Sequence, residues 1–173
     1  RTGLDWTEKY RVILNALGEL DCAAAILDGE VFVQGPQGLP DFHALRRELA
    51  RTKPKGLLFM AFDLLHLEGR DLRREPVEDR RQRLQQLLGP NEAGRPFQFS
   101  DHVIGEGAQF FAAAERMGLE GIISKKLGSR YRSGLSKSWL KVKTFAEGEL
   151  VVIGTSKGDL ASVALLARET EDH

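Results

Sequence analysis

Four short segments of this 173-residue chain place charged side chains beside apolar ones in patterns that a hydrophobic core does not require. In chain order they read DGE at 28–30, FD at 62–63, EGIISK at 120–125 and WLKVK at 139–143. Carboxylates accept hydrogen bonds from sugar hydroxyls, aromatic rings stack on flat bases, and ammonium groups attract phosphate oxygens. Taken together, the segments carry the side chains that a phosphorylated, hydroxyl-bearing ligand would need.

Each acidic or aromatic residue in these segments also has a plain structural explanation. Glu30 lies in a predicted strand, where a single carboxylate most often points to solvent; otherwise it accepts a ligand hydroxyl. Glu120 stands between two turn-like glycines, which suits a surface residue as well as a carboxylate that faces a metal ion or a substrate. Phe62 is most simply a core residue, or it stacks on a purine. Asp63 lies in an apolar run, and a buried carboxylate needs partners.

Two lysines of the last segment are predicted to share one face of a strand. Lys141 and Lys143 are two residues apart, so their ammonium groups lie on the same side, with Leu140 and Val142 on the other. Neighbouring ammonium groups repel each other. Two lysines side by side are therefore favourable only when an anion such as a polyphosphate lies between them. Lys125 projects from the strand that follows Glu120. The alternative is a strand face that is simply solvated.

The charge of the chain is unevenly distributed. Lys+Arg 25 and Asp+Glu 25 give a formal net charge of zero. Residues 121–146, however, contain seven basic residues and no acidic one, which leaves 18 basic against 25 acidic residues elsewhere, or −7. The seven are Lys125, Lys126, Arg130, Arg132, Lys137, Lys141 and Lys143. A zero average therefore does not argue against a nucleic-acid partner.

Composition excludes several classes of protein. The chain is 42% hydrophobic and 29% charged, which is ordinary for a globular protein. It has no apolar run of about 18 residues, so we expect no membrane span, and its first residues do not resemble a signal peptide. The single cysteine, Cys22, excludes an internal disulfide and a cysteine-based zinc site, and suggests the reducing cytoplasm. The four histidines show no metal-ligand spacing.

Apolar periodicity predicts a mixture of helices and strands without strict βαβ alternation, which favours an α+β fold. We expect a first helix capped by Thr7, and a strand at 24–34 that a turn at Asp28-Gly29 interrupts. The other predicted helices are 41–52, which Asp41 can cap, from Pro76 to about 88, and 106–117, which ends at Gly118. The other predicted strands are 57–67, 97–100, 121–126, 139–144, 150–155 and 162–168.

The order DGE, FD, EG-x-x-x-K, W-x-K-x-K resembles the covalent nucleotidyltransferases: ATP-dependent DNA ligases, RNA ligases and mRNA capping enzymes. The match is closest to the ligase module of bacterial DNA ligase D enzymes. It rests on RTGLDWTEKY, LDGEVFV, GLEGIISKK, YRSG…SKSWLKVK and GELVVIGTSKG, and covers essentially the whole chain. The resemblance implies a nucleotidyltransferase (ATP-grasp-like) adenylation domain at 1–147, built on antiparallel sheets and lacking its N-terminal part. It also implies the truncated first strands of an OB-fold barrel at 148–173.

The resemblance also implies residue roles. Glu30 would contact the ribose, Phe62 would stack on adenine, and Lys125 would lie beside the nucleotide. Lys141 and Lys143 would be catalytic, approaching the α-phosphate of ATP, and Glu120 would hold Mg²⁺ or Mn²⁺. The DNA contacts implied are Arg1 at the 5′-phosphate and Arg130, Arg132 and Lys137 at the backbone.

The sequence departs from the family pattern at the nucleophile. The family uses a lysine in a K-x-D-G segment upstream of R-T-G, and this sequence contains no K-x-D-G. Its DG pair at 28–29 belongs to the DGE segment. We therefore expect that the chain as given starts after the nucleophilic lysine and does not adenylate itself.

The function implied is that of an ATP-dependent DNA ligase. Such an enzyme seals strand breaks through lysyl-AMP and DNA-adenylate intermediates, here in double-strand break repair by end joining. ATP and Mg²⁺ or Mn²⁺ would be the cofactors, and nicked or broken double-stranded DNA the partner, in the bacterial cytoplasm at the nucleoid. The end-binding protein Ku is left open as a further partner. Two alternatives remain: an RNA ligase or capping-type nucleotidyltransferase, and a non-catalytic nucleic-acid-binding fragment.

Overall fold

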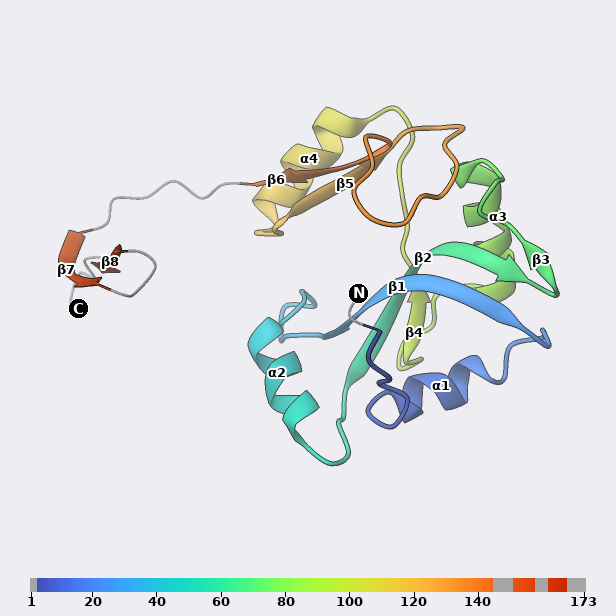
Figure 1. The fold of residues 1–173 in the computed structure, drawn as a ribbon, viewed down its shortest axis with the longest axis horizontal. Helices are drawn as coiled ribbons and strands as arrows, with labels where there is room; N and C mark the ends of the chain where they lie inside the picture. The colour runs from blue at the N-terminus through green and yellow to red at the C-terminus, as the bar shows by residue number, and fades with distance from the viewer. Residues whose placement is uncertain (1–2, 145–150, 158–161, 168–173) are drawn as a thin grey trace.

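The computed structural model describes residues 3–144, 151–157 and 162–167 and has the α+β organisation expected from the sequence (Figure 1). Within these ranges no helix is long and apolar enough to cross a membrane. The helices are α1 (Arg11–Leu17), α2 (Phe42–Ala50), α3 (Val77–Leu88) and α4 (Gly107–Arg116). The strands are β1 (Ala25–Val33), β2 (Leu57–Leu67), β3 (Arg70–Asp71), β4 (Phe97–Phe99), β5 (Gly121–Lys125), β6 (Trp139–Lys143), β7 (Val151–Lys157) and β8 (Ser162–Ala167).

The largest sheet is centred on β2. Strand β1 pairs with one edge of β2 in the antiparallel sense, while β3 and β4 pair with opposite ends of its other edge. The β1–β2, β2–β3 and β5–β6 pairs are antiparallel, as expected, whereas the β2–β4 pair is parallel and is an exception to that expectation. The reason is the connection: α3 lies between β2 and β4 in the chain, and such a crossover returns the chain in the same direction.

The hydrophobic core lies on one face of this sheet. Ala61 and Leu64 of β2 are fully buried against Leu84 of α3 and Phe97 and Phe99 of β4. Residues of α1 pack against the same cluster, so α1 and α3 cover the same face. Full burial of a large apolar side chain contributes roughly 1.5–3 kcal/mol, which makes this face the stable base of the domain.

Strands β5 and β6 form a separate antiparallel hairpin, which α4 covers. The Lys125 ammonium group at the end of β5 donates a hydrogen bond to the Phe62 carbonyl of β2, over 3.2 Å. The Thr144 N–H donates to the Glu120 carbonyl at the other end of the hairpin, over 3.0 Å. The hairpin therefore contacts the large sheet through its Lys125 end.

Two local expectations are wrong. Thr7 does not cap a helix: its N–H donates to Asp5 Oδ1 in a turn, and α1 begins only at Arg11. Asp28-Gly29 is not a turn, because β1 continues through both residues. The predicted cap at Asp41 is confirmed, since its Oδ1 accepts the Ala44 N–H over 2.8 Å at the start of α2.

Strands β7 and β8 pair in the antiparallel sense, with Val151 opposite Ala167 and Lys157 opposite Ser162. The hairpin predicted after the adenylation domain is therefore present. Residues 148–150, 158–161 and 168–173 of the proposed barrel segment lie outside the described residues. The assignment of this hairpin to an OB-fold stays a prediction.

Candidate functional site

Phe62 lies in a β-bulge of β2. In the β1–β2 register Asp28 is opposite Asp63 and Gly29 is opposite Ala61, so Phe62 has no partner on β1. Bulges release backbone groups from the ladder and are common beside active sites. The released Phe62 carbonyl accepts hydrogen bonds from Arg81 Nη1 over 2.7 Å and from Lys125 Nζ over 3.2 Å.

An aromatic cluster surrounds the ammonium group of Lys125. Its Nζ lies 3.7 Å from the centroid of the Trp139 ring and 4.7 Å from that of Phe62. The two rings meet edge to face at 6.1 Å, and Tyr131 meets Trp139 in the same way at 5.9 Å. Burial lowers the pKa of Lys125 to about 8. The cluster thus offers flat apolar surfaces and one cation in a partly dehydrated setting.

Glu30 faces the same side of the large sheet as this cluster. A Cβ on Gly29 would lie 2.3 Å from the Phe59 ring, which packs against the core, so Gly29 faces the core. Side chains alternate along a strand, so Asp28 and Glu30 face the other side. Asp28 accepts a hydrogen bond from the Tyr131 hydroxyl over 3.0 Å, and Glu30 is exposed ~7 Å further along β1.

Lys143 lies at the opposite end of the β5–β6 ladder from this cluster, and Lys141 lies at the middle of the ladder. Lys125 is paired with Trp139, Ile123 with Lys141, and Gly121 with Lys143. Residues directly opposite in an antiparallel pair share a face, so Lys125, Lys141 and Lys143 are on one side, as the spacing predicts. The two ends are ~13 Å apart along the strand.

Glu120 occupies the position between the two lysines. Its Oε1 lies 2.6 Å from Lys141 Nζ and 3.6 Å from Lys143 Nζ. The hydrogen bond from Lys141 holds the pKa of Glu120 below its usual value. The sequence predicts an anion between the lysines, and in the structure that anion is a carboxylate of the protein itself.

The close approach of β5 to β6 requires a glycine, Gly121, directly after Glu120. Gly121 adopts φ 148, and a Cβ built on it would lie 2.1 Å from the Val142 carbonyl oxygen. No other residue fits this close approach of β5 to β6. The glycine therefore keeps Glu120 within reach of Lys141.

A buried ion pair positions the bulge. Arg80 and Asp63 are both fully buried, and two hydrogen bonds of 2.8 Å join them. Arg80 Nη1 also donates to the Glu75 carbonyl over 2.6 Å and to the Ser129 carbonyl over 3.2 Å. Asp63 therefore points to α3 rather than to a ligand. Through Arg80, the ion pair joins β2 to the loop that carries Tyr131.

Three residues of this site are absent from the sequence-based set. Arg80 and Arg81 occupy the apolar stripe of α3, between Val77 and Leu84, and this placement is the signal that could have identified them. Arg81 donates to the Phe62 and Ser100 carbonyls. Tyr131 had no such signal, because its contacts depend on the fold of a loop.

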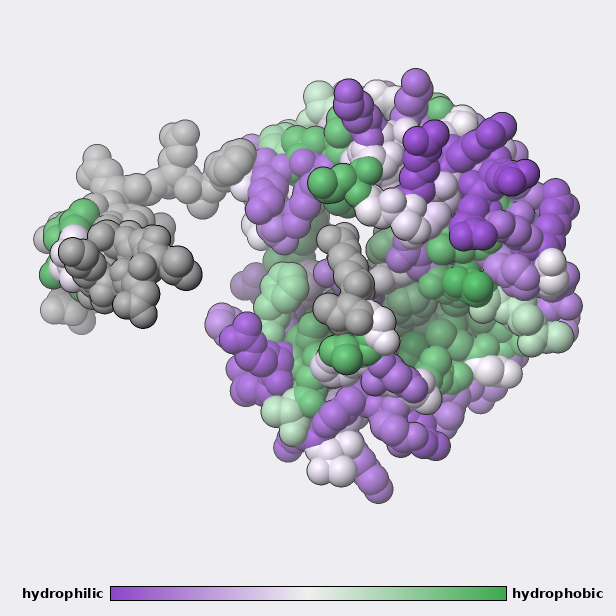
Figure 2. All heavy atoms as spheres, in the orientation of Figure 1, coloured by the Kyte–Doolittle hydropathy of each residue, from purple (hydrophilic) through white to green (hydrophobic). Residues whose placement is uncertain are grey.

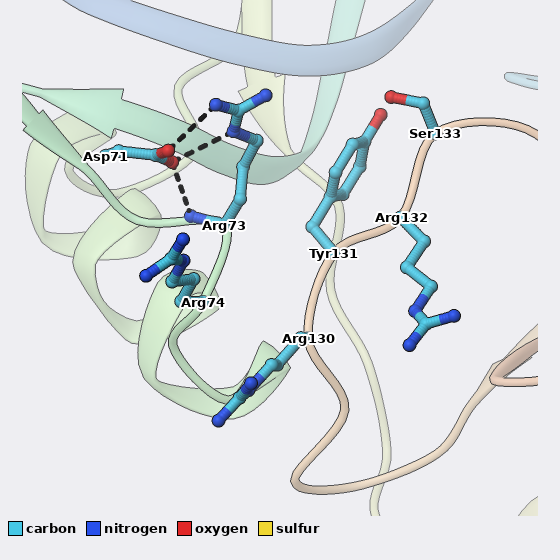
Figure 3. A pocket seen from close by; sticks show the side chains of 7 residues that line it. All are labelled: Asp71, Arg73, Arg74, Arg130, Tyr131, Arg132 and Ser133. Atoms are coloured by element: carbon cyan, nitrogen blue, oxygen red, sulfur yellow. Dashed lines mark hydrogen bonds and ion pairs between the residues drawn. The ribbon is translucent and has the colours of Figure 1, made fainter.

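The DNA-contact candidates separate from the cluster. Arg130, Arg132 and Lys137 are exposed on the loop between β5 and β6. Arg130 and Arg132 flank Tyr131 and line a surface pocket (Figure 3). Arg1 lies outside the described residues.

No group of three or more metal-ligating side chains occurs in the part of the chain that the structure describes. Glu120 is an exposed carboxylate next to two phosphate-attracting lysines. Mg²⁺ is commonly held by one or two carboxylates together with substrate phosphates and water. The donor set at Glu120 fits that mode, in which the protein supplies one ligand.

The family described as "ATP dependent DNA ligase domain" matches residues 1–143. The chain therefore belongs to the ATP-dependent DNA ligase domain family.

Relatives agree with this assignment. The chain is 39% identical over 154 residues to the multifunctional non-homologous end joining protein LigD of Pseudomonas aeruginosa, covering 89% of this chain and 18% of that protein. The crystal structure of the ligase domain of M. tuberculosis LigD matches with a TM-score of 0.63 and 33% identity, over 78% of this chain and 42% of that one. Mycobacterial DNA ligase D complexed with ATP and MES matches with a TM-score of 0.65 and 32% identity, over 84% and 46%. The chain thus spans about a fifth of the length of LigD.

Proposed function

We propose that this chain is most of the adenylation domain of an ATP-dependent DNA ligase, which seals strand breaks through lysyl-AMP and DNA-adenylate intermediates. The observation that carries the proposal is the order of groups along one face of the β5–β6 hairpin. An aromatic cluster around Lys125 lies at one end, and Lys141 and Lys143 lie toward the other. A nucleotide bound with its base at the cluster would place its phosphate at the lysines.

Phe62 would stack on adenine and Glu30 would accept the ribose hydroxyls. Phe62 is suited to the first role because its backbone is fixed: it lies in the bulge of β2, and its carbonyl accepts a hydrogen bond from Arg81. Glu30 is suited to the second because it is exposed on the same side of the sheet, ~7 Å from Asp28. Lys125 would lie beside the nucleotide.

Lys141 and Lys143 would stabilise the negative charge that develops on the α-phosphate oxygens. A phosphate can replace their present partner, Glu120, because an exposed ion pair that water screens contributes little to stability. A phosphate that pairs with both lysines would release the Glu120 carboxylate. That carboxylate could then hold Mg²⁺ or Mn²⁺, which would neutralise further phosphate charge when bound.

The nucleophile would be the lysine of a K-x-D-G segment, which the 173-residue sequence does not contain. Its neutral amine would attack the α-phosphorus and release pyrophosphate, leaving AMP on nitrogen. The AMP would pass to a DNA 5′-phosphate, and a 3′-hydroxyl would displace it to join the strand. Positioning and charge neutralisation supply most of the catalysis in such displacements.

The remaining parts of the proposal concern the parent protein. Residues 1–147 would form the adenylation domain and 148–173 the first strands of an OB-fold. Arg1, Arg130, Arg132 and Lys137 would contact nicked or broken DNA. The names of the LigD relatives, which specify non-homologous end joining, support a role in double-strand break repair. The proposal also includes a bacterial cytoplasmic location and Ku as a candidate partner.

The test is adenylation with α-labelled ATP and Mg²⁺. A version extended upstream to include a K-x-D-G lysine should become labelled, and Lys141→Ala in that version should reduce labelling by at least about 100-fold. Phe42→Ala, at an exposed phenylalanine of α2, is the matched control for Phe62→Ala, and only the latter should weaken ATP binding.

Covalent label on the 173-residue chain alone would contradict the proposed nucleophile. If the extended version is not labelled and Lys141→Ala changes DNA affinity alone, the chain is a nucleic-acid-binding module instead. Labelling by GTP in preference to ATP, or joining of RNA alone, would indicate a capping-type enzyme or an RNA ligase.

A further inference from the structure

Two adjacent surface pockets form a continuous basic surface outside the nucleotide site. The first, of about 280 Å³, is lined by Arg73 and Arg74 from the segment before α3 and by Arg130 and Arg132 from the β5–β6 loop (Figure 3). The second, of about 550 Å³, shares Arg130 and Arg132 and adds basic residues of the same loop, Lys126 and Lys137. On the face shown in Figure 2, hydrophilic side chains gather over α3, β3 and this loop.

The charge of these pockets is strongly positive. Six cationic side chains line them, against the single carboxylate of Asp71. Asp71 is already occupied, because Arg73 Nε and Nη2 donate to it over 2.9 and 2.8 Å. Arg74 makes no hydrogen bond or ion pair within the described ranges and is exposed. A polyanion is therefore the ligand that this surface favours.

The backbone holds the two sides of the first pocket together. The Tyr131 N–H donates to the Arg73 carbonyl over 2.9 Å, and the Gly128 N–H donates to the Glu78 carboxylate of α3 over 2.9 Å. Arginines that are far apart in the sequence are thus fixed on one surface. A prepared surface loses less entropy when it binds a ligand.

The directions of the arginines distinguish a long polyanion from a single phosphate. Figure 3 shows Arg74, Arg130 and Arg132 pointing in different directions rather than toward one point. Side chains that diverge in this way do not converge on one small anion, whereas they can contact several phosphates of an extended backbone.

The orientation of the proposed nucleotide excludes the outer phosphates of ATP as the ligand. Tyr131, a wall of the first pocket, contacts Trp139 at the aromatic end of the β5–β6 ladder. The phosphates of a nucleotide would extend the other way, toward Lys143, ~13 Å from that end. The first pocket therefore lies beside the base of the proposed nucleotide, on the side away from its phosphates.

We propose that Arg73, Arg74, Lys126, Arg130, Arg132 and Lys137 form one basic track that binds the sugar-phosphate backbone of duplex DNA. The inference rests on the proposed ligase function and extends its DNA contacts to Arg73, Arg74 and Lys126. The track contacts phosphates only, so it binds without regard to base sequence.

The test is the affinity of the 173-residue chain for a nicked duplex, measured by fluorescence anisotropy over a series of salt concentrations. Arg74→Gln removes one exposed charge from the track. Arg46→Gln removes the charge of another exposed arginine, which belongs to α2, and Figure 1 shows α2 away from α3. Each phosphate contact contributes about −0.9 to the slope of log affinity against log salt. Arg74→Gln should therefore reduce the magnitude of the slope by about 0.9 and weaken binding roughly tenfold at low salt (about 50 mM).

Arg46→Gln should leave the slope unchanged, and duplexes of different sequence should respond alike to Arg74→Gln. Equal slopes for Arg74→Gln and the original chain would overturn the inference. A loss of ATP affinity in Arg74→Gln with unchanged DNA affinity would overturn it too, since it would make the pocket a triphosphate site. Neither result bears on adenylation of the extended version, which tests the proposed function separately.

Discussion

The β2–α3 region and the β5–β6 hairpin each contain an ion pair beside the proposed nucleotide site, and the two pairs differ in exposure. Both side chains of the Arg80–Asp63 pair are 0% exposed. The side chains of the Lys141–Glu120 pair are 47% and 55% exposed. The N–O distances, 2.8 and 2.6 Å, are similar, so the distance between the charges does not separate them.

The two pairs have different roles because their surroundings differ. The buried pair is hydrogen-bonded on several sides and fixes the bulge at Phe62 relative to the loop at Ser129. The exposed pair has water as an alternative partner, so a phosphate or a metal ion can replace either member at little cost. The buried Arg80–Asp63 pair thus positions the aromatic surface, and the exposed Lys141–Glu120 pair can be exchanged for a phosphate or a metal ion when the ligand binds.

The largest expected effect comes from breaking the buried pair. Arg80→Ala leaves the Asp63 carboxylate buried without its partner and should lower the free energy of unfolding by about 3–5 kcal/mol. The double variant Arg80→Met, Asp63→Leu should recover most of this loss, because no charge is then left buried. Urea denaturation measures both. A loss below about 1 kcal/mol for Arg80→Ala would show that the pair does not support the region.

Gly121 tests how closely the hairpin strands must approach. Gly121→Ala places a Cβ 2.1 Å from the Val142 carbonyl oxygen, so it should destabilise the protein by about 1–3 kcal/mol. Gly107→Ala, at the first residue of α4, meets no atom within 4 Å and is the control. Thermal unfolding of the two variants distinguishes a local clash from a general effect of alanine. Equal midpoints would contradict the close approach.

Lys125 makes the free energy of unfolding depend on pH. Its pKa is about 8 in the folded protein against 10.5 for an ordinary lysine, so between these pH values the unfolded chain binds more protons. The free energy of unfolding should therefore rise as the pH increases from about 8 to 10.5. Water near the half-buried ammonium screens part of the effect, which leaves a rise on the order of 1 kcal/mol.

The measurement for Lys125 is the difference in unfolding free energy between the original chain and Lys125→Met over this pH range. Lys125→Met should lack the rise. A ¹³C titration of the lysine side chains provides the direct check. A midpoint near 10.5 for Lys125 would show that its ammonium is not dehydrated.

The smallest effect on stability is expected at the exposed pair. Glu120→Gln should leave the free energy of unfolding nearly unchanged, because water screens an exposed ion pair. It should nevertheless tighten ATP binding in the absence of divalent metal, because Lys141 and Lys143 lose a competing carboxylate. Calorimetric titration with ATP in EDTA measures this. Weaker ATP binding under these conditions would contradict the exchange of Glu120 for phosphate.

Much of the local structure could be predicted from the sequence. The apolar run at 57–67 is strand β2, Pro76 precedes α3, and Gly118 follows the end of α4. The shared face of Lys141 and Lys143 follows from alternation along a strand, which depends on two residues and nothing else. Thr7 and Asp28-Gly29 were predicted wrongly, because a cap or a turn depends on which side chains and strands lie nearby.

The sequence by itself determined the order of the elements, the basic character of residues 121–146, and the segments that carry the site. The tertiary structure decided the bulge at Phe62, the burial of Arg80 against Asp63, and the place of Glu120 between two lysines. It also brought Arg73 and Arg74 beside Arg130 and Arg132. Periodicity is a property of neighbouring residues. These features instead depend on strand register and on packing between residues that are far apart in the chain, such as Phe62 and Lys125, which are 63 positions apart.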